Sequence, residues 1–328
     1  MNTKSFFGKK NINKIKQGFI DDSIELISKD VETYKEIEKI GFNLECNICS
    51  TKLNDQVFTK HNINYYRCGE CGMVGAGKIS NYSEYNDLLY QDISYGSYTG
   101  FEESRLSEIY IPKADYLIKI LPDIRERGVI DIGAGLGYFV KALLLAGVKA
   151  KGYEINKDFV NNFNVIEKNT INSGALIHIE HEQLIDHLKN EDTNQVISLI
   201  GVLEHVEDPV KLLTELKNIG FKNFFISVPL FGFSTHFEAM NENYYHRQLA
   251  PDHSYLYTED ALLWLQEKIG LSRLSEWYFG QDMHDISRFL LSQGTGFNIQ
   301  ATLEMFEKMQ LVIDESKFSS EIHLIWEC

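Results

Sequence analysis

The 328-residue sequence lacks a long apolar run and an excess of positive charge. No stretch reaches the roughly 18 apolar residues that a membrane-spanning helix needs, so no bilayer span is predicted. The cationic start "MNTKSFFGKKNINKIKQ" is not followed by the apolar block of about 7–15 residues that marks a secretory signal, so we expect a cytoplasmic location. The 32 Lys and Arg are outnumbered by 47 Asp and Glu, and the resulting net charge of −15 repels phosphate backbones and anionic lipids. We therefore expect neither nucleic acid nor a membrane as a partner.

Cysteine is scarce, and four of the five cysteines are clustered, while Cys328 is the last residue. The pairs "CNIC" and "CGEC" are separated by 18 residues, a spacing typical of zinc sites built from two knuckles. Four thiolates fill the tetrahedral shell of zinc and leave no position for water or substrate. We therefore predict a structural zinc ribbon over residues 41–80, with Zn²⁺ bound by Cys46, Cys49, Cys68 and Cys71.

The rest of the chain divides by pattern. Residues 1–40 contain an amphipathic helical pattern, and the tyrosine-rich residues 81–110 suit either a connector or a lid over a ligand. From 111 to 328, strand and helix patterns alternate, as in "GVIDIGAG" followed by "GYFVKALLLAG". This alternation predicts a doubly wound α/β domain with a mostly parallel sheet. Long polar segments at about 231–257 and 281–318 are expected to be substrate-binding insertions.

The stretch "VIDIGAGLGYF" places three glycines at every second position after a predicted strand. Backbone without Cβ atoms lets a ligand approach closely at the carboxyl edge of a sheet. A dinucleotide fingerprint needs a small residue where Tyr138 stands, and no Lys-Ser or Lys-Thr follows to complete a phosphate-binding Walker loop. Glu154, at the end of the next predicted strand, can accept hydrogen bonds from two ribose hydroxyls. The pattern therefore disfavours NAD and favours a ligand whose ribose reaches Glu154.

In "VIDIGAGLGYF", "GYEIN" and "ISLIGVLEHVEDP" the chain resembles the class I S-adenosylmethionine-dependent methyltransferases. The resemblance covers residues 111–280 and implies a Rossmann-like, seven-stranded sheet, with "SEIHLIWEC" as its final antiparallel strand. It also implies that Asp131 and the glycines surround the methionine part of S-adenosyl-L-methionine, that Glu154 binds its ribose, and that residues 182–183 contact adenine. The cofactor-binding residues that we expect are Asp131, Gly133, Gly135, Gly137, Glu154, Glu182, Gln183 and, from the lid alternative, Tyr95 and Tyr98.

A zinc ribbon followed by such a core resembles the sugar C-methyltransferases of deoxysugar pathways, and methyltransferases of bacterial surface-polysaccharide clusters. The Glu-His pair that follows the fourth strand in those C-methyltransferases corresponds to Glu204 and His205. Their later His-Glu-His-Leu-x-Tyr segment corresponds to "PDHSYLY", where His253 aligns but Pro251 and Asp252 replace the first His and the Glu. The resemblance implies a nucleotide-linked or phosphorylated sugar as acceptor, and the two replacements favour O-methylation over C-methylation.

Methyl transfer to a hydroxyl needs a group that takes the proton, and His is the usual base near pH 7. We predict that His205 is this base, that Glu204 orients it or acts itself, and that His253 is a second proton-transfer group. We expect the acceptor to contact His236, His246 and Arg247, because Arg suits a phosphate group. No recognisable metal-ligand spacing links these histidines, so no catalytic metal is expected.

Three alternatives to a sugar O-methyltransferase stay open. The protein could be a sugar C-methyltransferase, a methyltransferase for an amine or a phosphate-type acceptor, or a non-catalytic protein whose ribbon docks a partner. The last alternative predicts no methyl transfer and no effect of His205→Ala. The sequence is compatible with a monomer or a small homo-oligomer.

Overall fold

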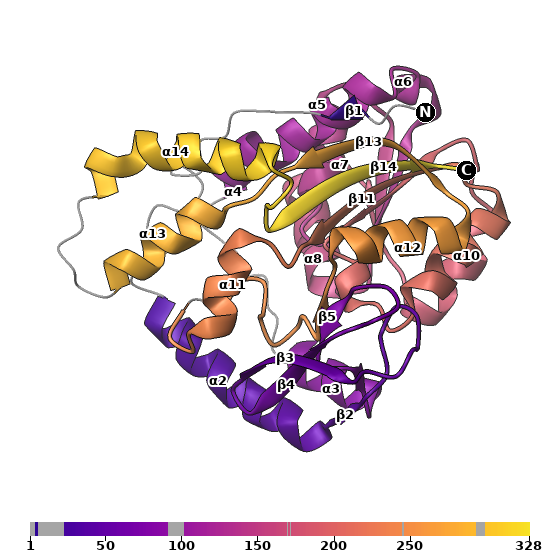
Figure 1. The fold of residues 1–328 in the computed structure, drawn as a ribbon. Coiled ribbons are helices and arrows are strands. Elements are labelled where there is room, and N and C mark those ends of the chain that lie inside the picture. The colour runs from indigo at the N-terminus through magenta and orange to yellow at the C-terminus, as the bar shows by residue number, and fades with distance from the viewer. Residues whose placement is uncertain are drawn as a thin grey trace.

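The computed structural model describes residues 4–5, 23–90, 102–168, 170, 172–244, 246–292 and 299–328. These residues form a large sheet flanked by helices, with a smaller sheet beside it (Figure 1). Two of the predicted cofactor contacts, Tyr95 and Tyr98, lie outside the described residues. In the part of the chain that is described, none of the helices has the length and apolar content needed to cross a membrane.

Eight strands form the main sheet in the order β1-β13-β14-β11-β10-β7-β8-β9. Their bounds are β1 Lys4–Ser5, β7 Val129–Ile132, β8 Ala150–Glu154, β9 Leu176–His178, β10 Val196–Ile200, β11 Asn223–Pro229, β13 Ser272–Tyr278 and β14 Glu321–Glu327. Strand β14 runs antiparallel to both neighbours, and the other pairs are parallel. The predicted doubly wound, mostly parallel sheet with a final antiparallel strand is confirmed, and the two-residue β1 adds an eighth strand to the seven predicted.

Helices cover both faces of the main sheet (Figure 1). Successive strand residues point to opposite faces, so Val129 packs in the cluster that contains α5 and α7, and Ile130 packs in the cluster that contains α10 and α12. The helix bounds are α5 Ile111–Ile120, α6 Ile124–Arg127, α7 Tyr138–Leu145, α8 Lys157–Ile166, α9 Leu184–Leu188, α10 Pro209–Ile219 and α12 Glu259–Ile269. Helix α12 begins where predicted, since the Thr258 hydroxyl accepts a hydrogen bond from the backbone N–H of Ala261 at 3.1 Å.

The cysteine-bearing segment forms short strands between helices α2 and α3. The bounds are α2 Ser23–Ile40, β2 Phe42–Asn43, β3 Asp55–Lys60, β4 Ile63–Arg67, β5 Val74–Gly75, β6 Lys78–Ile79 and α3 Tyr82–Tyr90. Strand β5 pairs antiparallel with β12 (Tyr255–Leu256), which belongs to the segment that follows β11. The smaller sheet, β12-β5-β4-β3, therefore combines the ribbon with the main domain.

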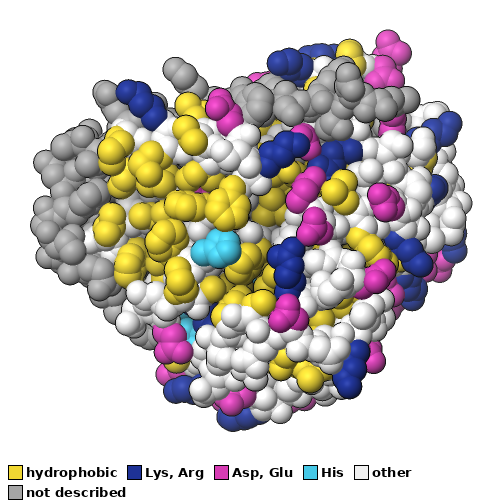
Figure 2. Space-filling view, in the orientation of Figure 1, with side chains coloured by type: hydrophobic (Ala, Val, Ile, Leu, Met, Phe, Trp, Pro, Cys, Tyr) yellow, Lys and Arg dark blue, Asp and Glu magenta, His cyan; other side chains and the backbone are white. Residues whose placement is uncertain are grey.

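A helical layer lies over one end of the main sheet (Figure 1). It consists of α11 Phe233–Met240, α13 Asp282–Ser292 and α14 Ile299–Glu315. Outside this layer, α4 Glu102–Arg105 and a π-helical turn at Leu106–Tyr110 precede α5. Figure 2 shows a largely apolar surface over these three helices. Its most exposed apolar side chains include Met240 and Val312. The predicted insertions at 231–257 and 281–318 supply these helices.

Candidate functional site

The glycine loop joins the end of β7 to the start of α7. Gly133, Gly135 and Gly137 all have a positive φ, at 68°, 54° and 74°. A Cβ on Gly133 would lie 2.7 Å from a methyl of Val202, and one on Gly137 would lie 2.6 Å from the Phe163 ring. A Cβ on Gly135 would meet nothing within 4 Å. Two of the glycines thus permit close packing, and the middle one presents bare backbone to an open space.

Glu154 connects this loop to the next strand. Its carboxylate is largely buried at the end of β8 and accepts hydrogen bonds from the backbone N–H of Gly135 at 2.7 Å and of Asn156 at 2.8 Å. Each carboxylate oxygen has about two lone-pair sites, so each can accept one further hydrogen bond from a ligand. Glu154 therefore holds the bare backbone of Gly135 in place and offers acceptor capacity beside it.

Asp131 lies deeper, within β7. The Ser198 hydroxyl donates a 2.6 Å hydrogen bond to its carboxylate, and burial raises the pKa of Asp131 to about 7. Glu182 and Gln183 lie in the short 3₁₀ turn that follows β9, and both are exposed. The three strand ends therefore place the predicted cofactor residues in the order β9, β8, β7 along one edge of the sheet.

The turn after β10 carries the predicted proton-transfer residues. It touches the glycine loop through Val202 and continues into a 3₁₀ turn at Leu203–His205. Glu204 is only 4% exposed, its Oε2 has no hydrogen-bond partner, and burial raises its pKa to about 7. His205 and His253 lie side by side, with ring centroids 5.0 Å apart. The structure thus brings Glu204, His205 and His253 together from positions far apart in the sequence.

Backbone carbonyls determine which ring nitrogen of each histidine is free. Nδ1 of His205 lies 3.1 Å from the carbonyl oxygen of Asp252, and Nδ1 of His253 lies 2.9 Å from that of Gln248. A carbonyl can only accept, so Nδ1 carries the hydrogen in both neutral rings. In the neutral form of each ring, the lone pair therefore lies on Nε2.

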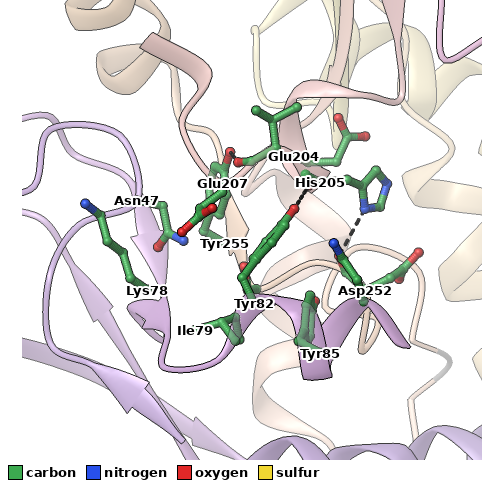
Figure 3. Close-up of a pocket in the computed structure, with 13 residues that line it drawn as sticks. Asn47, Lys78, Ile79, Tyr82, Tyr85, Glu204, His205, Glu207, Asp252 and Tyr255 are labelled. Carbon is green, nitrogen blue, oxygen red and sulfur yellow. Dashed lines mark hydrogen bonds between the residues drawn. The ribbon is translucent and has the colours of Figure 1, made fainter. Parts of the chain in front are cut away.

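A cavity lies between this turn and the ribbon (Figure 3). Its walls come from four segments, which contribute Asn47, Lys78, Tyr82, Tyr85, Glu204, His205 and Asp252 among others. The Tyr82 hydroxyl donates to the backbone carbonyl of His205, and the Tyr85 hydroxyl donates to that of Pro251 at 2.8 Å. Helix α3 thus closes the side of the cavity opposite Glu204, as Figure 3 shows.

Comparison with known protein families identifies the domain. The family profile described as "Methyltransferase domain" matches residues 105–276, which is more than half of the chain and includes the glycine loop, Glu154 and the turn after β10. The chain belongs to this methyltransferase family. The match confirms the prediction of a methyltransferase that uses S-adenosylmethionine. A small-molecule methyl acceptor follows from the same domain.

Solved structures resemble this methyltransferase at low sequence identity. A SAM-dependent methyltransferase from Archaeoglobus fulgidus is 16% identical with a TM-score of 0.42, and the match covers 69% of this chain and 97% of that one. Magnesium protoporphyrin IX methyltransferase from Synechocystis with bound SAH is 12% identical with a TM-score of 0.45, covering 70% and 88%. A Haloferax volcanii complex of the Trm112 methyltransferase activator and a methyltransferase is 13% identical with a TM-score of 0.48. That match covers 71% of this chain and 95% of the other. A comparison with curated protein sequences returns no match.

The four ribbon cysteines of the methyltransferase have the geometry of a metal site. The Sγ atoms of Cys46 and Cys71 are 3.5 Å apart, those of Cys49 and Cys68 are 3.4 Å apart, and all four lie within 4.8 Å of one another. A tetrahedral zinc with bonds of about 2.3 Å separates its sulfurs by about 3.8 Å. The backbone N–H groups of Ile48 and Cys49 point at Cys46 Sγ, at 3.4 and 3.5 Å. The residues present therefore fit a zinc ion bound by four thiolates.

The predicted acceptor contacts lie away from the cavity. His246 is buried, with Nδ1 3.2 Å from a carboxylate oxygen of Asp30 and Nε2 3.1 Å from Nε2 of His61. His236 packs against the rings of Phe231 and Phe318 on the face of α11, and burial lowers its pKa. The acceptor-binding role of His236 and His246 stays a prediction, and His246 already has partners inside the protein.

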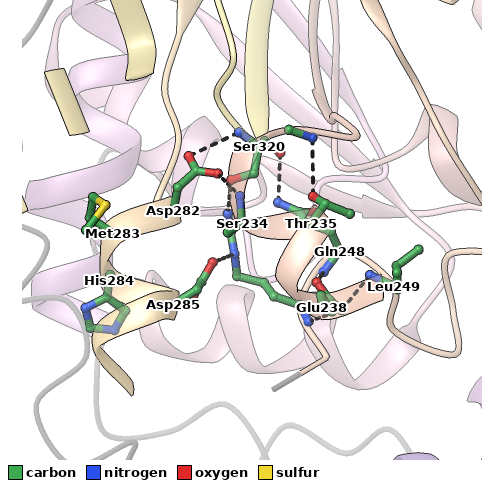
Figure 4. Close-up of polar contacts among 12 residues, drawn as sticks. Ser234, Thr235, Glu238, Gln248, Leu249, Asp282, Met283, His284, Asp285 and Ser320 are labelled. Atoms are coloured by element: carbon green, nitrogen blue, oxygen red, sulfur yellow. Dashed lines mark hydrogen bonds and ion pairs between the residues drawn. The ribbon is translucent and has the colours of Figure 1, made fainter. Parts of the chain in front are cut away.

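Arg247 bonds to a buried polar network of residues from α11, α13 and the position before β14, and Figure 4 shows Glu238, Asp285 and Ser320 of this network. Its Nε donates to Asp285 at 2.6 Å, and its Nη2 donates to the Ser320 hydroxyl at 2.6 Å. Glu238 of the same network accepts backbone hydrogen bonds from residues 247, 248 and 249. A phosphate would have to compete with the Asp285 carboxylate for this guanidinium, so the predicted acceptor contact of Arg247 also stays a prediction.

Sequence reasoning missed the residues that the ribbon and α3 contribute to the cavity. Asn47 lies between two zinc-spacing cysteines, and Lys78 lies in a two-residue strand, so neither carries a recognisable motif. The dense tyrosines of residues 81–110 were the available signal, and Tyr82 and Tyr85 of that segment do line the cavity.

Proposed function

We propose that the protein transfers the methyl group of S-adenosylmethionine to a hydroxyl of a nucleotide-linked or phosphorylated sugar that is used for capsule or lipopolysaccharide synthesis. The observation that supports this proposal most directly is the free Nε2 lone pair of His205, which lies on the turn in contact with the glycine loop. A neutral imidazole in that state can take a proton from a hydroxyl as the oxygen attacks.

The carboxyl edge of β7 and β8 is the proposed cofactor site. Asp131 and the three glycines would face the methionine part, and the free acceptor capacity of Glu154 would bind the ribose hydroxyls. Glu182 and Gln183 are the proposed adenine contacts, because they follow the adjacent strand β9. The cofactor, when bound, supplies an electrophilic methyl carbon on a positively charged sulfur.

His205 is the proposed general base. The bound cofactor would give its methyl group to the acceptor oxygen, leaving the electrons of the C–S bond on sulfur, and Nε2 of His205 would take the hydroxyl proton. The Asp252 carbonyl accepts from Nδ1 and stabilises the resulting positive ring. The carboxylate of Glu204 and the ring of His253 offer ligand atoms within 4.8 Å of those of His205, so both can stabilise or relay that charge.

The cavity wall supports a polar acceptor. Asn47, Lys78 and Asp252 line it, but it encloses only about 10 Å³, so an acceptor would meet these polar residues only after the surrounding segments move apart. The Lys78 ammonium donates to the Ser50 hydroxyl at 2.8 Å and is 3.9 Å from the Glu45 carboxylate. It is the proposed partner of an acceptor phosphate, because it lies nearer the cavity than Arg247 does.

We also propose that Cys46, Cys49, Cys68 and Cys71 hold a structural zinc ion. The ion would keep Asn47, which lies between the first two cysteines, in its place on the cavity wall. Binding of structural zinc contributes on the order of 10 kcal/mol to the folding of such segments.

The test is a screen of sugar nucleotides and sugar phosphates with isotope-labelled S-adenosylmethionine. We expect label transfer to at least one of them, and we expect His205→Ala to lower turnover by about 10²–10⁴-fold while binding of S-adenosylhomocysteine is unchanged. The matched control is His187→Ala, at an exposed position on α9. Wild-type turnover by His205→Ala would refute the assignment of the base, and the absence of label transfer to any sugar would refute the acceptor class.

A further inference from the structure

We propose that Glu204, His205 and His253 form a second metal site, which binds one divalent transition-metal ion such as Zn²⁺ next to the acceptor cavity. One ligand atom from each of these three residues lies within 4.8 Å of the other two. Ligand atoms at about 2.1 Å from a tetrahedral ion are about 3.4 Å apart, so small side-chain rotations would bring the three onto one ion.

The carboxylate of Glu204 supplies the first independent argument. Its Oε2 is buried and has no hydrogen-bond partner, although buried carboxylate oxygens are normally paired. Among the contacts of the described residues, no hydrogen bond or ion pair joins Glu204 to either histidine. A carboxylate and two imidazoles thus lie within 4.8 Å of one another without bonding to each other, an arrangement that a shared cation would stabilise.

The orientation of the two rings supplies the second argument. Metal-binding histidines usually donate the hydrogen of their other ring nitrogen to a carbonyl or carboxylate, which fixes the ring and its tautomer. His205 and His253 both show this arrangement at Nδ1, through the carbonyls of Asp252 and Gln248. Two rings held in the same way, with Nε2 free on each, are what a metal ion needs from a preformed site.

The ligand set determines the kind of ion and what it can do. Two imidazoles with one carboxylate suit Zn²⁺ or another first-row transition metal, whereas Mg²⁺ and Ca²⁺ prefer oxygen ligands. Three protein ligands leave at least one coordination position open, unlike the four ribbon cysteines. The Glu204 side of this site lines the acceptor cavity, so the open position is available to an acceptor oxygen.

The part that the ion would play in methyl transfer rests on the proposed function, whereas the binding of the ion to Glu204, His205 and His253 does not depend on it. An acceptor hydroxyl bound to the ion would lose its proton to solvent water, because coordination to Zn²⁺ lowers the pKa of a bound O–H group to near 7. The oxygen would then form the bond to the methyl carbon as the C–S bond breaks. His205 would act as a ligand in the loaded enzyme, and its lone pair could serve as a base only in the metal-free site.

The experiment is calorimetric titration with Zn²⁺ of protein that already carries one zinc at the ribbon, in a Cys328→Ser background that removes the exposed thiol. We expect one further equivalent to bind, and we expect Glu204→Gln and His253→Gln each to weaken it at least tenfold. Glu204→Gln keeps the shape of the side chain, so it is the variant to trust if His253→Gln folds poorly. The control is His236→Gln, which should leave the second equivalent unchanged because His236 lies outside the cluster.

Two results would overturn the inference: no second equivalent, or a second equivalent that Glu204→Gln and His253→Gln leave intact. Neither result touches the proposed sugar methylation, which is measured separately with labelled cofactor. A second equivalent that depends on Glu204, together with no methylation of any sugar, would instead refute the proposed function and leave the metal site standing.

Discussion

Replacement of Glu154 tests the cofactor site most sharply, because this one carboxylate both holds the glycine loop and is the proposed ribose acceptor. Its oxygens accept two short backbone hydrogen bonds, at 2.7 and 2.8 Å, and it is largely buried. A hydrogen bond to a charged group contributes about 1.5–3 kcal/mol, so two ribose hydroxyls amount to about 3–6 kcal/mol. Glu154→Ala should therefore weaken binding of S-adenosylhomocysteine by about 10²–10⁴-fold.

The assay is calorimetric titration of S-adenosylhomocysteine into the wild type, Glu154→Ala and Glu154→Gln, with Glu126→Ala on the exposed face of α6 as control. Glu154→Gln should lie between the other two, because its amide oxygen still accepts but its amide nitrogen does not. Loosening of the Gly135 loop could also weaken binding, so the same titrations use an analogue that lacks the ribose 2′-hydroxyl. Loss of that hydroxyl should weaken binding to the wild type about tenfold or more and leave Glu154→Ala unaffected. An equal effect of the missing hydroxyl on both proteins would refute the ribose contact.

Three further predictions concern the loop, the buried acid and the ribbon. Gly137→Ala should lower the free energy of unfolding in urea by about 2–5 kcal/mol, because a Cβ there combines left-handed backbone strain with a 2.6 Å contact to Phe163. An unchanged unfolding midpoint would contradict this packing. Burial raises the pKa of Asp131 to about 7, so the native state holds the carboxyl proton more tightly than the unfolded chain does. The contribution of Asp131 to the free energy of unfolding should therefore fall by up to about 4 kcal/mol as pH rises from 4 to 7. Asp131→Asn should remove that fall, and urea unfolding at pH 4 and pH 7 measures it; identical pH profiles for both proteins would count against it. Cys68→Ser should remove the one zinc equivalent held by the ribbon, measured with no zinc added, and should expose the ribbon to proteolysis. A metal-free ribbon that resists protease would exclude the zinc proposal.

The fold followed from local patterns that the sequence repeats. In "VIDIGAGLGYF" the apolar run becomes β7, the glycines form the loop and the next apolar residues form α7, because strand, turn and helix each have a short-range signature. The antiparallel strand β14 was predictable only through the resemblance to methyltransferases, since its sequence does not indicate its direction. The π-helical turn and the pairing of β12 with β5 have no local signal.

The candidate site was predictable where it lies on strand ends and obscure where it depends on distant contacts. Glu154 ends β8 and His205 follows β10, so the edge of the sheet that they share could be inferred. Arg247 suggested a phosphate site, but its partner Asp285 is 38 residues further along the chain, and only the fold brings them together. The approach of His253 to His205 likewise depends on the path of the segment after β11.

The shared sheet of ribbon and core has a practical consequence for experiments with chelators. Strand β12 pairs with ribbon strand β5, and the residue before it, Ser254, lines the cavity beside Glu204 together with Asn47, which lies between two of the ribbon cysteines. If the four thiolates hold zinc as proposed, removing it would therefore loosen one wall of this cavity as well as the ribbon. Inhibition by EDTA would look like proof of a catalytic metal even if the only ion lost were the structural one, so metal dependence must be assigned by ligand substitution and not by chelation.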